Sequence, residues 1–275
     1  MSKLRIAING AAGRMGRRII ALASVDPHFQ VIAALEFPEH PQIGQDAGEV
    51  AGVGPLGVLL TSHLNTDVDV LIDFSVPESA DAITEICVAR NIPLVMATTG
   101  FTPAQKERLA QAATTIPLVW APNMSLAVNL AMRLAAAAAA CLKEYPEGAD
   151  VEIIERHHRF KEDAPSGTAL RFGEIIAGVM GQAQHVHGRS GRPGSRTRHE
   201  IGYHALRVGD NPGEHTIVFG MLGETLELTV RASNRDCYAQ GALAAARFVA
   251  GRQPGHYTMY DVLDHPAPIN PTPTA

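Results

Sequence analysis

The sequence predicts an α/β protein with a Rossmann-like parallel-sheet domain and a second, α+β domain whose sheet is mainly antiparallel. Three observations support this prediction. Strand-like and helix-like segments alternate through the first part of the chain, which is the pattern of a parallel sheet covered by helices. A glycine-rich loop separates the first of these strands from the first helix. Later in the chain, strand-like segments follow one another across short turns, which is typical of antiparallel sheets.

The first domain is expected to hold five strands and the helices between them. The strand over 69–75 has the nearly continuous apolar character of a strand buried on both faces. The first helix, 13–25, carries apolar residues at the spacing of one helical face. Thr102, Pro103 and Gln105 form the pattern of a capping box, so another helix should begin there. The five expected strands cover residues 3–9, 30–36, 69–75, 92–100 and 116–123.

An alanine-rich helix over 126–142 leads into the second domain. Beyond it the sequence predicts a strand over 150–158, a helix over 166–181 and a long Gly- and Arg-rich loop over 182–198. The proline-rich segment 266–275 is expected to be a flexible tail. Turn signals such as "GDNPG" separate three further strands, which a last helix follows, over residues 199–209, 213–222, 224–233 and 238–251.

Composition and charge argue against several classes of protein. The chain has 275 residues, enough for one large or two modest domains, and its formal charge of −5 disfavours nucleic acid as the main partner. The most apolar long segment, 126–142, is too short and too weakly hydrophobic to span a bilayer, so no membrane partner is expected. Cys87, Cys141 and Cys237 lie far apart and the N-terminus has no signal-peptide pattern, so we expect a cytoplasmic location.

The glycine-rich loop "NGAAGRMG" predicts a dinucleotide site. Gly10, Gly13 and Gly16 follow a strand and open a helix, and Glu36 lies at the tip of the second strand. In such loops the glycines permit a tight turn, close approach of N–H groups to a pyrophosphate, and close packing of helix on strand. The helix N-terminus adds partial positive charge, and Glu36 is expected to bind ribose hydroxyls. The alternative is that these glycines only turn the chain.

The choice between NADH and NADPH stays open at this point. Arg14, inside the loop, could reach a 2′-phosphate and favour NADPH, whereas Glu36 favours the free hydroxyl of NADH. Two further loops, 97–100 and 121–125, follow strands four and five, where open α/β sheets bind their ligands. Their small hydroxyl residues and Asn123 are candidates to contact the nicotinamide end, although each loop alone could be a plain turn.

The run "ERHHRFKEDAPSGTA" concentrates proton donors and acceptors just before an expected helix. His157 and His158 should point to opposite faces of a strand, so they cannot share one role. Histidine transfers protons near neutral pH, and one of the two is expected to act as an acid or base. Paired histidines also suggest zinc, but adjacent strand positions diverge, and no cysteine or HExxH pattern supports a metal site.

The residues after the histidines predict an anion site. Ser166 is a natural N-cap, which leaves the backbone N–H groups of Gly167 and Thr168 at the start of a helix. Lys161 can hold a carboxylate nearby. The run therefore predicts a small anionic substrate beside an acid–base histidine.

The segment "EIIERHHRFKEDAPSGTA" closely resembles the signature of the dihydrodipicolinate reductase family, also called 4-hydroxy-tetrahydrodipicolinate reductases. The motifs "GAAGRMG", "IDFSVPE", "ATTGF", "APNMSLAVNL", "GEHTIVFG" and "QGALAAA" occur in the family's order, so the resemblance covers nearly the whole chain. It implies a dinucleotide-binding domain over 1–124, completed by 236–275, and a substrate-binding and oligomerisation domain over 125–235. It also implies hydride transfer from NADPH or NADH to C4 of an unsaturated heterocyclic dicarboxylate in lysine (diaminopimelate) biosynthesis, and a homotetramer.

The resemblance further implies roles for individual residues. His157 matches the family's proton donor and Lys161 its second catalytic residue. The implied substrate-binding residues are His158, Ser166, Gly167 and Thr168. The implied cofactor contacts are Gly10, Ala11, Ala12, Gly13, Arg14, Met15, Glu36, Phe37, Ala97, Thr98, Thr99, Ala121, Pro122, Asn123 and Met124, and no metal ligand is expected.

Two positions depart from the family pattern, and two other functions share part of it. Phe37 stands where many members with good NADPH use carry arginine, which leaves the cofactor preference open, and Arg231 stands where many carry histidine. A different NAD(P)-dependent dehydrogenase would share the glycine loop but would not need the histidine run. A nucleotide sensor without chemistry would typically have lost His157 or Lys161, and both are present.

Overall fold

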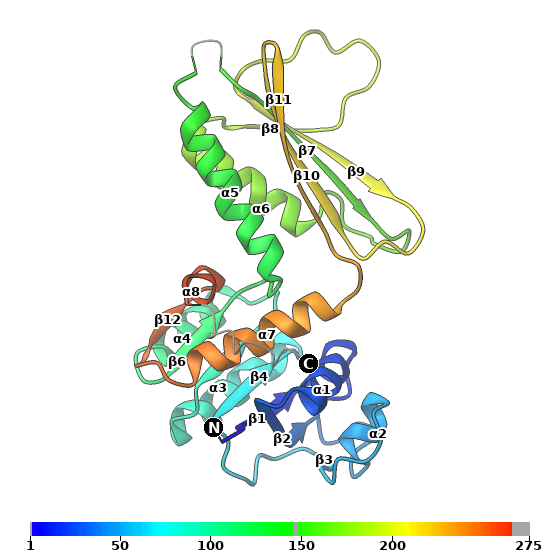
Figure 1. Cartoon of the computed structure of the whole chain (residues 1–275), viewed down its shortest axis with the longest axis vertical. Coiled ribbons are helices and arrows are strands. Elements are labelled where there is room, and N and C mark those ends of the chain that lie inside the picture. Colours follow the sequence, from blue (N-terminus) through cyan, green and yellow to red (C-terminus); the bar gives the residue numbers. More distant parts are fainter. Residues whose placement is uncertain (1, 146–147, 266–275) are drawn as a thin grey trace, which may run out of the picture. The chain divides into compact units, whose positions relative to one another are not determined.

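A computed structural model describes residues 2–145 and 148–265. The chain divides into two compact units, each with its own sheet (Figure 1). Unit 1 comprises Met1–Leu126 and Arg235–Ala275, and unit 2 comprises Ala127–Asn234. The predicted α/β class with two kinds of sheet is confirmed. The tail expected over 266–275 lies outside the described residues.

Unit 1 is built on a parallel sheet of seven strands. The strand order is β12-β6-β5-β4-β1-β2-β3, and every neighbouring pair is parallel. The order changes direction at β1 and β4, so the loops after these strands diverge and leave room for a ligand. The strands are β1 (Leu4–Asn9), β2 (Phe29–Leu35), β3 (Leu60–Thr61), β4 (Val70–Asp73), β5 (Leu94–Met96), β6 (Pro117–Trp120) and β12 (Gly255–Tyr257).

Helices cover both faces of this sheet. One buried cluster joins the sheet to α1 (Arg14–Val25) and α7 (Asp236–Val249), and a second joins it to α3 (Pro77–Arg90) and α4 (Pro103–Ala112). Thr102 caps α4 in the expected capping box with Gln105, and Pro103 occupies the first turn. Two short helices, α2 and α8, complete the unit over Ala47–Ala51 and Met259–Asp264.

Two strands of unit 1 were not among the five expected. β3 has two residues and β12 has three, so neither is long enough to carry a recognisable alternation or apolar run. Both lie at the edges of the sheet. Their pairing depends on neighbouring strands rather than on their own residues.

Unit 2 contains a five-stranded mixed sheet in the order β11-β10-β7-β9-β8. The pairs β10–β11 and β7–β10 are antiparallel, as expected, and they span more residues than the parallel pairs β7–β9 and β8–β9. α6 (Gly167–Met180) crosses from β7 to β8, and the segment 188–199 then crosses to β9, which pairs in parallel with both strands. The strands are β7 (Asp150–His157), β8 (Gln184–His187), β9 (Glu200–Arg207), β10 (Glu214–Met221) and β11 (Glu224–Arg231).

The predicted loop over 182–198 is wrong in its first part, because β8 occupies Gln184–His187. This strand has only four residues, most of them exposed, at the edge of the sheet. Its polar sequence "QHVH" shows no alternation that would distinguish it from a loop. Backbone pairing with β9, rather than burial of side chains, defines it as a strand.

The core of unit 2 forms where α6 packs against β7 and β9. Ser166 is its N-cap as expected, with its Oγ accepting the N–H of Ala169. A Cβ at Gly173 would lie 1.7 Å from the Tyr203 hydroxyl, so this ring packs directly on the helix backbone.

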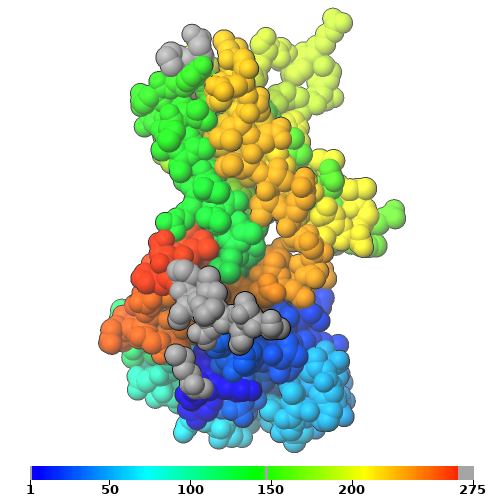
Figure 2. Space-filling model, in the orientation of Figure 1, coloured from blue at the N-terminus to red at the C-terminus, as the bar shows by residue number. Residues whose placement is uncertain are grey.

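The outer strand β11 is largely exposed, and Figure 2 shows it in gold on the open surface. The alanine-rich helix α5 spans Leu126–Leu142, and among the described residues no helix is both long and apolar enough to cross a membrane.

Candidate active site

The glycine loop of unit 1 adopts a conformation that excludes larger residues. Gly10 has φ +74°, and a Cβ there would lie 2.6 Å from the Phe74 carbonyl oxygen. A Cβ at Gly16 would lie 2.2 Å from the Gly10 carbonyl oxygen, so the first turn of α1 packs directly on the loop. Gly13 is the N-cap of α1 and makes no side-chain cap, and the first turn holds no acidic residue. The N-terminus of α1 therefore keeps the electropositive character that an anion requires.

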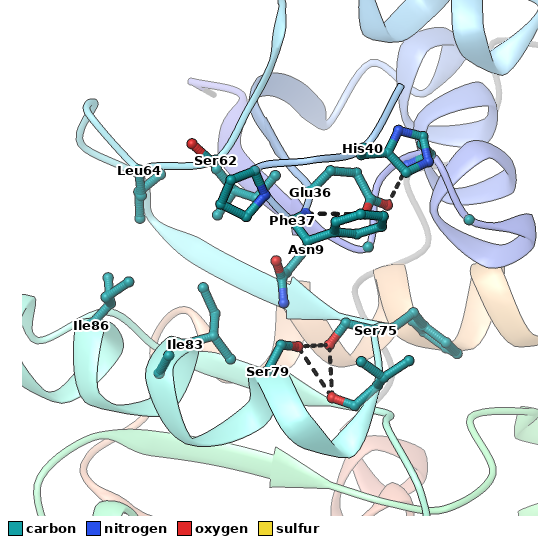
Figure 3. A pocket seen from close by; sticks show the side chains of 18 residues that line it. Asn9, Glu36, Phe37, His40, Ser62, Leu64, Ser75, Ser79, Ile83 and Ile86 are labelled. Atoms are coloured by element: carbon teal, nitrogen blue, oxygen red, sulfur yellow. Dashed lines mark hydrogen bonds between the residues drawn. The ribbon is translucent and has the colours of Figure 1, made fainter. Parts of the chain in front are cut away.

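A pocket of about 580 Å³ lies beside this loop. Its lining includes Gly10, Ala12 and Gly13 of the glycine loop and Glu36 at the end of β2. The Glu36 carboxylate accepts the backbone N–H of Ala12 at 3.0 Å. Figure 3 shows Glu36 on one side of the pocket and, on the other, Ser79 of α3 and Ser75 just before that helix.

Two rings line this pocket on the same side as Glu36. Phe37 is 56% exposed, and its ring meets the edge of His40 with 5.1 Å between centroids (Figure 3). His40 Nδ1 accepts the backbone N–H of Gln42 at 3.2 Å, which leaves Nε2 to carry the ring proton. An exposed aromatic surface beside a carboxylate suits a nucleoside, with stacking for the base and hydrogen bonds for the ribose.

A second pocket, of about 320 Å³, adjoins the first at Phe74. It is lined at the start of α1 by Arg14 and Met15, and near the start of α7 by Arg235 and Tyr238. The other lining residues are Ala97, Pro122, Asn123 and Met124. Neither arginine has an ion-pair partner among the residues that the structure describes. Two such cations, at the starts of α1 and α7, favour a phosphate ligand.

Asp73 ties three strand ends together beneath these pockets. Its carboxylate is fully buried and accepts hydrogen bonds from Asn9 Nδ2 at 2.6 Å, Ser75 Oγ at 2.7 Å and Thr98 Oγ1 at 2.6 Å. Burial raises the pKa of Asp73, while these hydrogen bonds oppose the rise. Ser75 in turn contacts Ser79, as Figure 3 shows.

The remaining predicted cofactor residues, Ala11, Thr98, Thr99 and Ala121, are not among the residues that line the two pockets. Thr98 donates its hydroxyl proton to Asp73 and accepts the N–H of Ser75 at 3.0 Å, so its side chain is already used. Thr99 is exposed. Ala11 and Ala121 belong to the buried cluster of unit 1, where they support the loops through packing.

In unit 2, His157 is held by a buried carboxylate. His157 and Glu155 lie two residues apart on β7, so both side chains point to the same buried face. His157 Nδ1 lies 2.5 Å from Glu155 Oε2. Arg207 donates to both oxygens of Glu155, at 2.9 and 2.7 Å, and the N–H of Ser166 donates to Oε1 at 3.1 Å.

The pKa values of this cluster move in directions that its contacts explain. Burial lowers the pKa of His157, and the hydrogen bond with Glu155 opposes that change. Burial alone would raise the pKa of Glu155, but hydrogen bonds with Arg207 and His157 hold it below its usual value. Burial lowers the pKa of His215 to about 4, so this histidine is neutral at pH 7.

His215 contacts both His157 and Ser166, the N-cap of α6. Its ring meets the edge of the His157 ring with 5.3 Å between centroids, and its Nε2 lies 3.0 Å from Ser166 Oγ. Because His215 is neutral, Nε2 can accept the Ser166 hydroxyl proton. Ser166 is thereby fixed as the N-cap of α6, with Gly167 exposed and Thr168 half-buried in the first turn.

Lys161 and His158 complete the predicted residues of unit 2. Lys161 Nζ lies 2.7 Å from Asp163 Oδ1, and its charge contributes to lowering the pKa of His157. His158 follows the last residue of β7, and its buried Nδ1 has no hydrogen-bond partner among the described residues. The structure therefore brings His157, Ser166 and Lys161 into one electrostatic cluster within unit 2.

Comparison with known proteins identifies the family. Residues 4–124 match the family described as dihydrodipicolinate reductase, N-terminus, and residues 127–263 match dihydrodipicolinate reductase, C-terminus. The chain belongs to the dihydrodipicolinate reductase family. It is an oxidoreductase, and its N-terminal family domain implies a pyridine nucleotide cofactor.

Relatives of this reductase family match over nearly their whole length. The 4-hydroxy-tetrahydrodipicolinate reductase of Rhodopirellula baltica is 57% identical over 268 residues, which cover 94% of this chain and 96% of the relative. That of Syntrophotalea carbinolica is 47% identical, covering 94% and 98%. The solved structure of dipicolinate-bound dihydrodipicolinate reductase from Paenisporosarcina sp. TG-14 has a TM-score of 0.77 and 25% identity, covering 94% and 99%.

Several residues of the candidate site were not predicted from the sequence. Asp73 gave a usable signal, because a carboxylate interrupts an otherwise apolar strand. Glu155 gave another, since it lies two positions before His157 on the same strand face. Arg207 and Arg235 gave none, because only the folded chain brings them to these clusters. No group of three or more His, Cys, Asp or Glu residues suited to a metal ion occurs in the described part of the chain.

Proposed function

We propose that the protein reduces 4-hydroxy-tetrahydrodipicolinate to tetrahydrodipicolinate with NADH or NADPH, in the diaminopimelate route to lysine. The names of its relatives support this substrate. The observation that carries the proposal is the buried His157–Glu155 pair beside the capped start of α6 in unit 2. This cluster offers a proton donor, a cation and helix N–H groups to one small dicarboxylate.

The pockets of unit 1 fit a pyridine nucleotide. The glycine loop leaves no room for a Cβ at Gly10 or Gly16, and it opens onto a helix N-terminus without an acidic first turn. Glu36 and Phe37 would hold the adenosine, and Arg14 and Arg235 would pair with phosphates. The bound cofactor supplies the hydride.

The start of α6 would hold a substrate carboxylate. The N–H groups of Gly167 and Thr168 lie in its first turn, where anions are stabilised. The unpartnered Nδ1 of His158 and the ammonium of Lys161 are suited to bind carboxylate oxygens. A site for this substrate needs two cationic or N–H-lined walls because a dicarboxylate carries two negative charges.

His157 would donate the proton that balances hydride addition. Hydride addition to the conjugated C=C–C=N system leaves negative charge, which a proton from a neighbouring acid quenches. Glu155 stabilises the imidazolium form of His157 against the effect of burial. Burial thus favours release of the proton from His157, and Glu155 favours its uptake.

The cofactor pocket favours use of both nucleotides, with NADH at least comparable to NADPH. Glu36 faces the pocket and would repel a 2′-phosphate, and Phe37 supplies no charge there. Arg14 lines the second pocket rather than the one that contains Glu36. Arg17 is occupied, because it donates to the Ala12 carbonyl at 2.6 Å and to Gln42 at 3.0 Å.

The unit 2 sheet also offers a surface for assembly into the proposed homotetramer. Ile154 and Leu206 are 39% and 40% exposed on the sheet face opposite the buried residues of β7. Exposed apolar side chains on one sheet face are typical of subunit interfaces. Light scattering after size-exclusion chromatography should give four times the chain mass of 29.3 kDa. We also propose a cytoplasmic location, because the three cysteines lie far apart in the sequence.

Oxidation of NADH and NADPH with freshly prepared substrate tests the activity. We expect turnover with both cofactors, and His157→Gln should cut kcat about a hundredfold while leaving cofactor affinity nearly intact. Full activity in this variant would remove His157 from the proton-donor role. Absence of turnover by the native protein would contradict the proposed substrate.

The ratio of kcat/KM for the two cofactors tests the preference. A preference for NADPH above about tenfold, or about 1.4 kcal/mol, would mean that a phosphate site exists outside the residues named here. Phe37→Arg should shift preference toward NADPH, more so at low salt because the new contact is electrostatic.

A further inference from the structure

The hydrogen bond between Glu155 and His157 has a defined direction. Glu155 is 1% exposed and His157 is 8% exposed, so water does not compete for their contact. An ionised carboxylate only accepts hydrogen bonds, so a bond of 2.5 Å to Nδ1 requires that Nδ1 carries a proton. The other ring nitrogen, Nε2, is then the one that gains and loses the reacting proton.

Glu155 is held ionised and immobile by its other contacts. Arg207 donates to both carboxylate oxygens, and the backbone N–H of Ser166 donates to Oε1. Three donors besides the imidazole therefore satisfy the buried carboxylate, as a buried charge requires. The Ser166 contact also joins Glu155 to the residue that caps α6.

We propose that Glu155 is the positioning residue for His157, accepting its Nδ1 proton so that Nε2 faces the reaction, with Arg207 holding Glu155 in place. This inference rests on the proposed proton-donor role of His157. Glu155 acts through His157 and need not contact the substrate. The arrangement follows the general logic in which a third group orients an acid–base histidine.

The charges that face His157 determine how the pH dependence of kcat should respond. Glu155 is negative and favours the imidazolium, whereas Lys161 and Arg207 are positive and disfavour it. The neighbouring His215 stays neutral at pH 7. As a proton donor, His157 must be protonated, so kcat should fall as the pH rises above its pKa. Removal of the Glu155 charge should therefore move this alkaline limb to lower pH.

Glu155→Gln tests the inference in the full-length protein. The alkaline limb of the kcat profile should move to lower pH by at least about one unit, the usual effect of a neighbouring opposite charge. The value of kcat at pH 7 should fall by between about tenfold and a thousandfold. Affinity for NADH should stay within experimental error, because both cofactor pockets are lined by residues of unit 1 and Glu155 belongs to unit 2.

Two further variants separate positioning from a general loss of structure. The double variant Glu155→Gln/Arg207→Gln removes both charges of this ion pair, so it leaves no unpaired cation. The alkaline limb of its kcat profile should move in the same direction as that of Glu155→Gln, by a smaller amount. Glu152→Gln is the matched control. Glu152 lies on the opposite face of β7 and also binds a histidine and an arginine, His204 at 2.8 Å and Arg189 at 2.8 Å. Its substitution should leave the limb where it is in the native protein.

The outcomes distinguish this inference from the proposed function. If the native protein turns over but the limbs of both Glu155 variants coincide with the native one, Glu155 does not position His157. If Glu152→Gln shifts the limb as far as Glu155→Gln does, the effect is structural and the inference fails. If the native protein shows no turnover, the proposed function itself is wrong.

Discussion

Two histidines in unit 2 have different hydrogen-bond partners although their rings are in contact. Burial lowers the pKa of both His157 and His215. His157 also has a carboxylate, Glu155, at hydrogen-bond distance, whereas His215 has a serine hydroxyl. A neutral hydroxyl does not stabilise an imidazolium as a carboxylate does. His157 is therefore suited to the proposed proton transfer, whereas His215 holds Ser166.

The proposed carboxylate site of unit 2 can be tested by separating charge from hydrogen bonding. Lys161→Ala should weaken binding of pyridine-2,6-dicarboxylate and slow turnover. The Lys161 ammonium supplies a positive charge for the carboxylate, and the same charge acts on the pKa of His157. Thr168→Val should weaken binding by about 1.5–3 kcal/mol, the value of a hydrogen bond to a charged group, with a smaller change in kcat. Isothermal titration with the dicarboxylate measures both. Unchanged affinity in both variants would contradict the proposed carboxylate pocket.

Asp73 should act on cofactor binding without touching the cofactor. Asp73→Asn places an NH₂ group among donors from Asn9, Ser75 and Thr98, so at least one buried donor loses its acceptor. We expect a loss of about 1–3 kcal/mol in unfolding free energy and weaker NADH binding.

A matched pair of variants at Thr98 provides the control for Asp73. Thr98→Ser keeps the hydroxyl that donates to Asp73, whereas Thr98→Val removes it. Fluorescence titration with NADH should find near-native affinity in the serine variant and weaker binding in the valine variant. Equal affinities in the two would mean that the hydroxyl plays no part in organising the pocket.

At the scale of helices and strands, local sequence signals were reliable where one residue decides the structure. Thr102 and Ser166 were predicted as N-caps and are N-caps. The short strands β3, β8 and β12 were not predicted, because pairing with neighbours defines them. The site follows the same division. The glycine loop and the histidine run were found as local patterns, whereas Arg207 and Arg235 reach their clusters only through the fold.

The approach of α7 to the loop over 121–124 depends on one glycine. A Cβ at Gly241 would lie 1.7 Å from the Met124 carbonyl oxygen, and Met124 lines the second pocket. Gly241→Ala should therefore displace this loop, weaken NADH binding and lower the unfolding free energy by about 1–3 kcal/mol.

Gly178 is the matched control for this helix position. It also lies inside a helix, α6, but a Cβ there would meet nothing within 4 Å. Gly178→Ala should stabilise the protein by up to about 1 kcal/mol, since alanine has the higher helix propensity. Thermal unfolding and NADH titration of both variants check the pair. A Gly241→Ala variant as stable as Gly178→Ala would contradict the close packing of α7 on the loop.

At the scale of the whole chain, unit 1 is assembled from segments far apart in the sequence. The described part of unit 1 combines residues 2–126 with 235–265. Arg235 and Tyr238 join Arg14 in one pocket although more than two hundred residues separate them. The amphipathic pattern of the last helix does not by itself say which domain it packs on, and only the family resemblance placed it with the first. Packing of α7 on α1 and the sheet resolves this point.

Stability of the whole molecule should depend on pH through its buried histidines. The pKa of His215 is lowered from 6.5 to about 4 in the folded protein. As the pH falls through 6.5, the unfolded chain binds a proton that the folded chain does not, so the unfolding free energy falls until about pH 4. A shift of this size corresponds to roughly 3 kcal/mol, at 1.36 kcal/mol per pKa unit. The lowered pKa of His157 adds to the same slope, whereas carboxylates with lowered pKa values, such as Glu155, contribute only at lower pH.

Urea unfolding between pH 7 and pH 5 measures this slope. His215→Gln removes the titrating ring but keeps an amide oxygen that can accept the Ser166 hydroxyl proton, so α6 should keep its cap. We expect the variant to lose less stability than the native protein over this pH interval, whatever its stability at pH 7. An identical slope in the two proteins would contradict a neutral His215 in the folded state, and with it the assignment of Ser166 as the proton donor in their hydrogen bond.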